Sequence, residues 1–110
     1  MLIMPVVRRI TLFKIPDEAN RQKLLEMYNN MQIKATKDGE RYILSVEAGE
    51  TQGDQRTQGY TIAATSTFKN QEDFEFYDKE CTAHDELRTF ARSVSQGFCM
   101  VYFTTGLPKK

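Results

Sequence analysis

The fold of this chain is first indicated by residues 6–17, which read Val6-Val7-Arg8-Arg9-Ile10-Thr11-Leu12-Phe13-Lys14-Ile15-Pro16-Asp17. Residues 6–15 are rich in Val, Ile, Leu and Phe, as β-strands are. Pro16 ends the strand because proline has no backbone N–H to donate to a sheet. From Asp17 to about Gln32, apolar side chains recur with the period of a helix: Leu24, Tyr28 and Met31, with Leu25 beside them. The stretch predicts a strand that leads directly into a helix.

The remaining elements follow in an order that identifies a fold class. Lys37-Asp38-Gly39 indicates a turn, and the polar, glycine-containing residues 49–59 indicate an exposed, mobile loop. The other expected elements are strands at 42–48, 60–68 and 98–104, and a helical region that starts at Asn70 and runs to about Ser93. The order β-α-β-β-α-β predicts a single α+β, ferredoxin-like domain, in which both helices cover one face of a four-stranded antiparallel sheet.

The last strand indicates how the other face of the sheet is used. Phe98, Met100 and Tyr102 alternate with Cys99, Val101 and Phe103, so both of its faces are apolar. A half-solvated antiparallel sheet should have one polar face, and an exposed apolar face marks an interaction surface. The sequence therefore predicts a homodimer through the sheet face that carries Ile10, Leu12, Val101 and Phe103.

The only histidine of the chain, His84, lies seven residues after Tyr77. On a continuous helix this spacing is two turns, so both side chains would share one face. Thr82 with Asp85 forms a second, weaker capping pattern, and the alternative is a helix that breaks near Cys81, which would alter this geometry. A lone imidazole titrates near neutral pH, and a tyrosine on the same face can orient it, so the pair is the raw material of one general acid/base.

Composition argues against several classes of protein. The 15 basic and 15 acidic residues balance, and the only basic pairs are Arg8-Arg9 and Lys109-Lys110, so we expect no nucleic-acid partner. No apolar run approaches the ~18 residues that span a bilayer, and the apolar opening at residues 1–7 is too short for a signal peptide. We expect a cytoplasmic protein with no membrane partner.

The two cysteines, Cys81 and Cys99, do not have the spacing of metal ligands. With a single histidine, Cys and His alone cannot complete a zinc site, so we expect neither a metal nor a cofactor. A disulfide between the cysteines and two reduced, half-buried thiols are both compatible with the sequence, and the second fits an intracellular protein.

Several short motifs, in the right order over nearly the whole chain, resemble the stress-responsive A/B barrel (Dabb) domain family. They are Arg9–Ile15, Gly59–Thr61, Ser66–Phe68, Tyr77 with Ala83–His84, and Val101–Phe103. The resemblance implies a dimeric α+β barrel over residues 1–110, with a core at about 6–104 and a small cavity between sheet and helices. It also implies cofactor-free acid/base chemistry, because a polyketide cyclase of the family uses a His/Tyr pair.

The resemblance assigns the catalytic pair to His84 and Tyr77. Asp85-Glu86 follows the histidine where the cyclase is apolar and small, and two pocket histidines of the cyclase are absent, their places taken by Arg9 and Ile62. The candidate ligand-binding residues are Tyr28, Arg9, Ile62, Leu24, Phe98 and Met100.

Alternatives remain for several of these side chains. His84 is either a general base or a histidine satisfied in a structural cavity, and Tyr28 is either a pocket or a core residue. Arg9 either points into the cavity, where a carboxylate or an anionic ligand must pair it, or is exposed at the start of the strand. The run from Asp85 to Arg88 is expected to be a solvated helix face.

Two functions follow from these patterns. The first is a cofactor-independent cyclase or lyase-like enzyme, or a binder, for a hydrophobic carbonyl compound. The second is a non-catalytic stress-response protein whose role is stable dimerisation or assembly. An open cavity that reaches His84 favours the first, and a cavity filled by side chains favours the second.

Overall fold

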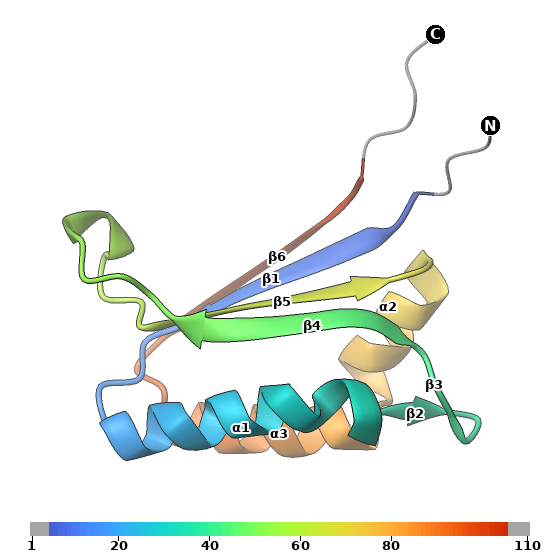
Figure 1. Cartoon of the computed structure of the whole chain (residues 1–110), viewed down its shortest axis with the longest axis horizontal. Helices are drawn as coiled ribbons and strands as arrows, with labels where there is room; N and C mark the ends of the chain where they lie inside the picture. The colour runs from blue at the N-terminus through green and yellow to red at the C-terminus, as the bar shows by residue number, and fades with distance from the viewer. Residues whose placement is uncertain (1–4, 106–110) are drawn as a thin grey trace, which may run out of the picture.

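The computed structural model describes residues 5–105 of the chain; the first four residues of the apolar opening and the Lys109-Lys110 pair lie outside this range. Its main sheet has four strands in the order β4-β5-β1-β6, each antiparallel to its neighbours (Figure 1). The strands are β1 (Val7–Phe13), β4 (Ile43–Glu50), β5 (Ile62–Phe68) and β6 (Phe98–Thr104). The predicted α+β, ferredoxin-like arrangement is confirmed.

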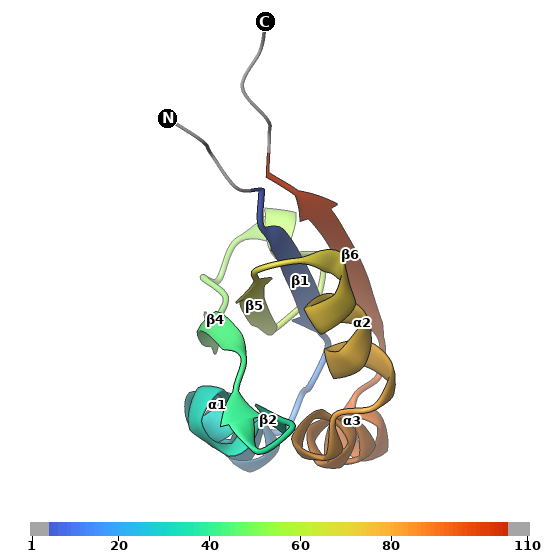
Figure 2. The same ribbon diagram turned by 90° about the vertical axis from the view of Figure 1, so that its right-hand side faces the viewer.

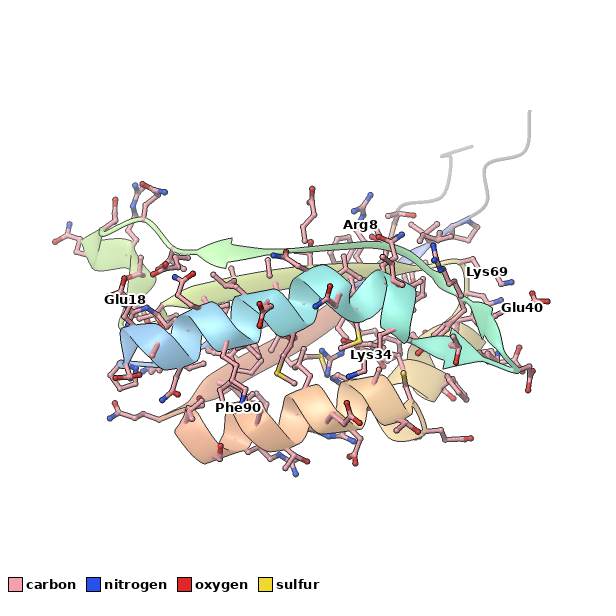
Figure 3. The ribbon with its side chains drawn as sticks, turned by 60° about the horizontal axis from the view of Figure 1, so that its bottom comes forward. Arg8, Glu18, Lys34, Glu40, Lys69 and Phe90 are labelled. Carbon is pink, nitrogen blue, oxygen red and sulfur yellow. The ribbon has the colours of Figure 1, made fainter. Side chains whose placement is uncertain are left out.

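Three helices lie on one side of this sheet. Helices α1 (Glu18–Lys34) and α3 (Thr82–Val94) run side by side beneath it, and α2 (Gln71–Lys79) lies near one end, between the strands and α3 (Figures 1 and 2). At the seam between α1 and α3, Lys34 pairs with Glu86 at 2.9 Å, and the Lys23 ammonium lies 4.7 Å from the Phe90 ring centre (Figure 3). No helix within residues 5–105 is long and apolar enough to cross a bilayer.

Side-chain caps explain where two of the helices begin. The Asp17 carboxylate accepts from the backbone N–H of Asn20 at 3.1 Å, at the start of α1. The Asn70 side chain accepts from the N–H of Asp73 at 2.8 Å, at the start of α2. These contacts satisfy N–H groups that a helix leaves without intrahelical partners, so the polar residues just outside each helix set its first turn.

The predicted turn at residues 37–39 is confirmed, and it closes a hairpin that the sequence did not indicate. Strands β2 (Thr36–Lys37) and β3 (Glu40–Arg41) contain two residues each, too few for a periodic pattern. Asp38 and Gly39 have positive φ values of 55° and 82°, as a tight turn requires. Lys37 holds the hairpin to α2 through a 2.7 Å ion pair with Asp73, which is 2% exposed.

The polar loop has the predicted length but lies two residues later in the chain, at residues 51–61. Strand β4 continues through Glu50, and the loop that follows contains a short 3₁₀ helix, η1 (Gln55–Thr57), capped by the Asp54 side chain. Gly59 has a φ of 90°, which glycine adopts without strain, and it lies three residues before β5. The mobility of this loop stays a prediction.

Alternation along β1 divides the molecule into two sides. Val7, Arg9, Thr11 and Phe13 point toward the helices and are buried, together with alternate residues of β5. The core between the layers also contains Leu24, Tyr28 and Met31 of α1 and Leu87 and Ala91 of α3. The predicted helical stripe of the first helix is therefore confirmed as a core face.

The other side of the sheet, here called the open face, has no helix over it within the described part of the chain (Figure 2). Its residues include Ile10 and Leu12 of β1 and, opposite them in the register, Val101 and Cys99 of β6. Val101 is 53% exposed, and its neighbour on the same face, Phe103, is 45% exposed. The residues predicted to form the dimer interface therefore share one exposed apolar surface.

Candidate active site

A break between α2 and α3 sets the geometry of the site. The backbone N–H groups of Glu80 and Cys81 both donate to the Phe76 carbonyl, at 2.8 and 2.9 Å. Residues seven apart on one straight helix are separated by about 10 Å along its axis. Here the chain turns, and the rings of Tyr77 and His84 stack with centres 3.8 Å apart and planes 16° apart. The alternative of a helix break is the one that the structure adopts.

His84 is held in a single orientation. It is 2% exposed, and its Nδ1 lies 2.8 Å from the backbone carbonyl oxygen of Tyr77. A carbonyl can only accept, so Nδ1 carries the hydrogen, and Nε2 of the neutral ring carries the lone pair. Nε2 has no hydrogen-bond partner within residues 5–105. Nε2 is thus the ring atom that can act as a base.

The surroundings of His84 keep it uncharged. Burial lowers the pKa of the imidazole from 6.5 to about 4, and the positive charge of Arg9 lowers it in the same direction. The hydrogen bond to the Tyr77 carbonyl opposes these effects and raises the pKa. Near neutral pH the ring is therefore a neutral base.

Arg9 points toward the cavity, which decides between the two positions considered for it. It is 8% exposed, donates to the Thr11 hydroxyl at 2.9 Å, and pairs with Asp78 of α2 at 3.3 Å. Its guanidinium carbon lies 5.3 Å from the centre of the Tyr77 ring. Its Nε is buried with no partner in the described part of the chain. The bonds to Thr11 and Asp78 therefore use only some of the hydrogen-bond donors of Arg9.

Two buried tyrosines add hydroxyl groups. Tyr28 is 2% exposed, Tyr77 is fully buried, and neither hydroxyl has a partner among residues 5–105. Burial raises the pKa of both phenols well above the ordinary value of 10, so both stay protonated. A protonated phenol that contacts a ligand donates a hydrogen bond to it.

A cavity of about 270 Å³ lies between β1, β6 and the helices, and His84 lines it. The other lining residues are Arg9, Thr11, Phe13, Tyr28, Asp78, Leu87, Arg88, Ala91, Arg92, Ser95, Phe98 and Met100. Its lining combines apolar side chains with polar and charged groups, as small-molecule sites do. No group of three or more His, Cys, Asp or Glu side chains suited to a metal ion occurs within the described residues.

The structure separates the predicted ligand-binding residues into two groups. Arg9, Tyr28, Phe98 and Met100 line the cavity together with His84. Ile62 and Leu24 do not line it: both are fully buried in the core, so the structure does not place them at this cavity as expected.

The predicted pair of Tyr77 and His84 does lie together, but the Tyr77 hydroxyl has no hydrogen-bond partner among residues 5–105. Tyr77 contacts His84 through its ring face and its carbonyl, and it does not line the cavity. Its ring packs against Phe68 on another side, with centres 5.0 Å apart. This packing holds the tyrosine in the core, where it can orient the histidine.

The run from Asp85 to Arg88 is only partly the solvated face that was predicted. Asp85 and Glu86 are exposed, but Leu87 is 1% exposed and Arg88 lines the cavity. The signal that could have found Arg88 is its helical spacing: residues 84, 88 and 92 are four apart, so His84, Arg88 and Arg92 lie along one side of α3. Both cysteines are free thiols, with Cys81 buried and Cys99 exposed.

Known proteins match this chain in sequence and in fold. A fusaristatin A biosynthesis cluster protein of Gibberella zeae is 35% identical over 98 residues, which cover 88% of this chain and 71% of the relative. A hydroxynitrile lyase of Passiflora edulis superposes with a TM-score of 0.80 at 17% identity, covering 98% of this chain and all of the other.

A dimeric, ferredoxin-like protein of unknown function from Bacteroides fragilis superposes with a TM-score of 0.72 at 20% identity, covering 94% of this chain and 98% of the other. At 17% and 20% sequence identity, the likeness to the hydroxynitrile lyase and to the Bacteroides fragilis protein shows a shared fold alone. The family assignment rests on sequence, because residues 7–104 match the sequence model of a domain family. The chain belongs to the stress-responsive A/B barrel (Dabb) domain family.

Proposed function

We propose that this protein is a homodimeric, cofactor-independent acid/base enzyme that acts on an apolar carbonyl compound. The observation that carries the proposal is the buried His84: its Nδ1 is hydrogen-bonded, its Nε2 has no partner among residues 5–105, and the residue lines a cavity. A neutral base of this kind can take a proton from a carbon next to a carbonyl group.

The proposed step uses three side chains. His84 Nε2 removes the proton, and the electron pair of the broken C–H bond moves to the carbonyl oxygen and forms an enolate. The Tyr28 hydroxyl and the Arg9 guanidinium are donors in the cavity wall that stabilise the charge on this oxygen. In a cyclisation, the enolate carbon then attacks a second carbonyl, whose π electrons form an alkoxide that takes the proton back from His84. In a lyase, the enolate instead expels a leaving group from the neighbouring carbon, and this group departs with its electron pair and takes that proton.

Tyr77 is a positioning residue in this proposal. Its carbonyl fixes the tautomer of His84, and its ring fixes the plane of the imidazole. Such a role predicts that Tyr77→Phe keeps the carbonyl and the ring, and therefore retains most of the activity.

Two findings support small-molecule chemistry over assembly alone. The cavity beside His84 is not filled by side chains. The 35% identical relative is described as a biosynthesis cluster protein, and a hydroxynitrile lyase shares the fold. The homodimer is supported by the apolar open face and by the dimeric protein of the same fold.

Proton abstraction can be tested before the substrate is known. Aryl ketones and β-diketones are incubated with the protein in D₂O, and deuterium incorporation next to the carbonyl is followed by NMR. We expect exchange catalysed by the wild type and a loss of about 10²-fold or more in His84→Gln. Lys79→Gln, an exposed change outside the cavity, is the matched control. Equal exchange rates in His84→Gln and wild type would overturn the proposal.

A thermal-shift screen of ligands on the same variants separates binding from chemistry. A catalytic His84 predicts that His84→Gln still binds ligands that stabilise the wild type. A structural histidine predicts a lower melting temperature for the variant and unchanged turnover of any substrate.

A further inference from the structure

The charged groups around the cavity are unbalanced. Among residues 5–105, three arginines line it, Arg9, Arg88 and Arg92, against a single carboxylate, Asp78. His84 adds no charge near neutral pH, because burial lowers its pKa to about 4. The lining therefore has an excess of positive charge, in a chain whose overall charge is zero.

The positive charge is not fully paired inside the protein. Asp78 is committed to Arg9 at 3.3 Å. Arg88 donates to the backbone carbonyl of Asp78 at 2.8 Å and reaches Asp85, on the exposed side of α3, at 3.2 Å. Arg92 is exposed and forms no ion pair within residues 5–105. The Arg92 guanidinium therefore has no carboxylate partner among residues 5–105, and the Arg88 guanidinium is held in place by its two hydrogen bonds.

The inner wall also presents donors without acceptors. Arg9 is more than nine-tenths buried, lines the cavity, and has an Nε with no partner in the described part of the chain. The Tyr28 hydroxyl is also buried and has no hydrogen-bond partner among residues 5–105. Buried donors cost free energy unless an acceptor meets them, so these groups favour a ligand rich in acceptor oxygens.

We propose that the ligand of this cavity is an apolar keto acid, bound with its carbonyl group near His84 and its carboxylate between Arg88 and Arg92. The assignment names the substrate class of the proposed enzyme, and so it rests on the proposed function. Guanidinium groups bind carboxylates through paired, charge-assisted hydrogen bonds.

Helix geometry sets the separation of the two groups on the ligand. Arg88 and Arg92 follow His84 by one and two helical turns, which is about 6 and about 12 Å along the axis of α3. A carbonyl held at His84 is therefore separated from its carboxylate by a short chain or one ring. The apolar lining residues Phe13, Leu87, Phe98 and Met100 are suited to cover that middle part.

The test compares ligands that differ in one charge. Phenylacetate, 3-phenylpropionate and 4-oxo-4-phenylbutyrate are titrated into the protein beside their primary amides, at an ionic strength of about 0.05 M, where screening is weak. Calorimetry measures affinity, and the NMR signals of the only histidine report binding in this cavity. We expect the acids to bind roughly tenfold more tightly than the amides.

Variants then locate the charge that produces the preference. Arg92→Gln should reduce the preference for acids to about threefold or less, and Arg92→Glu should abolish it. Lys79→Gln, which removes an exposed charge outside the cavity, should leave the preference unchanged. Because Arg92 is exposed, these variants should keep the wild-type melting temperature within about 2 °C.

The outcomes separate this inference from the proposed function. Equal binding of acids and amides, an unchanged preference in Arg92→Glu, or no binding of any acid at millimolar concentration would each overturn the keto-acid assignment. Deuterium exchange that depends on His84 while acids and amides bind alike would leave the proposed function standing. Preferential binding of acids without any exchange would support the ligand class and contradict the enzyme.

Discussion

In the middle of β1, at residues 9–12, the usual distribution of polar and apolar residues between the two sides of a sheet is reversed. On the side that faces the helices, Arg9 and Thr11 are 8% and 4% exposed. On the open face, Ile10 and Leu12 are only half-buried, and Val101 beside them is 53% exposed. Buried polar groups need partners, and exposed apolar patches mark interaction surfaces. The inner side is therefore suited to a polar ligand group, and the outer side is suited to a second protein surface.

The largest expected effect comes from placing a charge on the open face. Val101→Asp should convert the proposed dimer to monomer or aggregate, because an unpaired charge in a dry interface costs several kcal/mol. Size-exclusion chromatography with light scattering measures the mass. Thr104→Asp, an exposed position on the opposite face of the same strand, is the matched control and should remain dimeric. A dimer that persists in Val101→Asp would show that the open face is not the surface that binds a second copy.

The second prediction concerns the pH dependence that buried His84 imposes. Its pKa is about 4 in the folded protein and 6.5 when exposed, so below pH 6.5 the unfolded chain takes up a proton that the folded chain refuses. Protonation therefore favours unfolding, and the contribution of His84 to the free energy of unfolding should fall by about 3 kcal/mol between pH 6.5 and 4. Above pH 6.5 this group should have no effect.

Urea denaturation of wild type and His84→Gln at several pH values isolates this effect, since the carboxylates titrate in both proteins. The difference between the two free energies of unfolding should change across the window from 6.5 to 4 and be constant above it. Parallel curves throughout would mean that the imidazole is accessible to solvent protons and that the inner side is less sealed than the structure indicates.

A smaller effect should distinguish two adjacent arginines on opposite sides of β1. Arg9→Met leaves Asp78 without its partner, and because that carboxylate is 30% exposed the loss of stability should be about 2 kcal/mol. It should also raise the pKa of His84, because Arg9 lowers that pKa. An NMR titration of the single histidine measures the change. Arg8→Met is the control: Arg8 is exposed, extends away from the helices (Figure 3), and should leave the His84 titration unchanged.

Much of the fold could be predicted because local patterns specify it. The strand at 98–104 was predicted with its observed bounds, and the Asn70 cap marked the start of α2. Alternation along β1 and β6 identified the open face, since period-two patterning is a property of consecutive residues. The hairpin at residues 36–41 was missed except for its turn, because strands of two residues are too short to show a period.

The site was less predictable because its contacts connect distant parts of the chain. Arg9 and Asp78 are 69 positions apart, and no spacing rule relates them. Ile62 and Leu24 were expected in the cavity but lie in the core, because the packing of α1 and β5 fills the space around them. Arg92 was overlooked because an exposed arginine near a helix end resembles any solvated residue.

His84 best illustrates which features are determined by the sequence and which depend on the tertiary structure. The order of strands and helices, the apolar open face and the presence of one histidine seven residues after a tyrosine are all legible in the sequence, because each depends on neighbouring residues. The stacking of the two rings, the free Nε2, the lowered pKa and the cavity with its three arginines arise only when the helix breaks and α3 packs under β1. Burial and the placement of charge are long-range properties of the packed chain, and they convert an ordinary histidine into a candidate base.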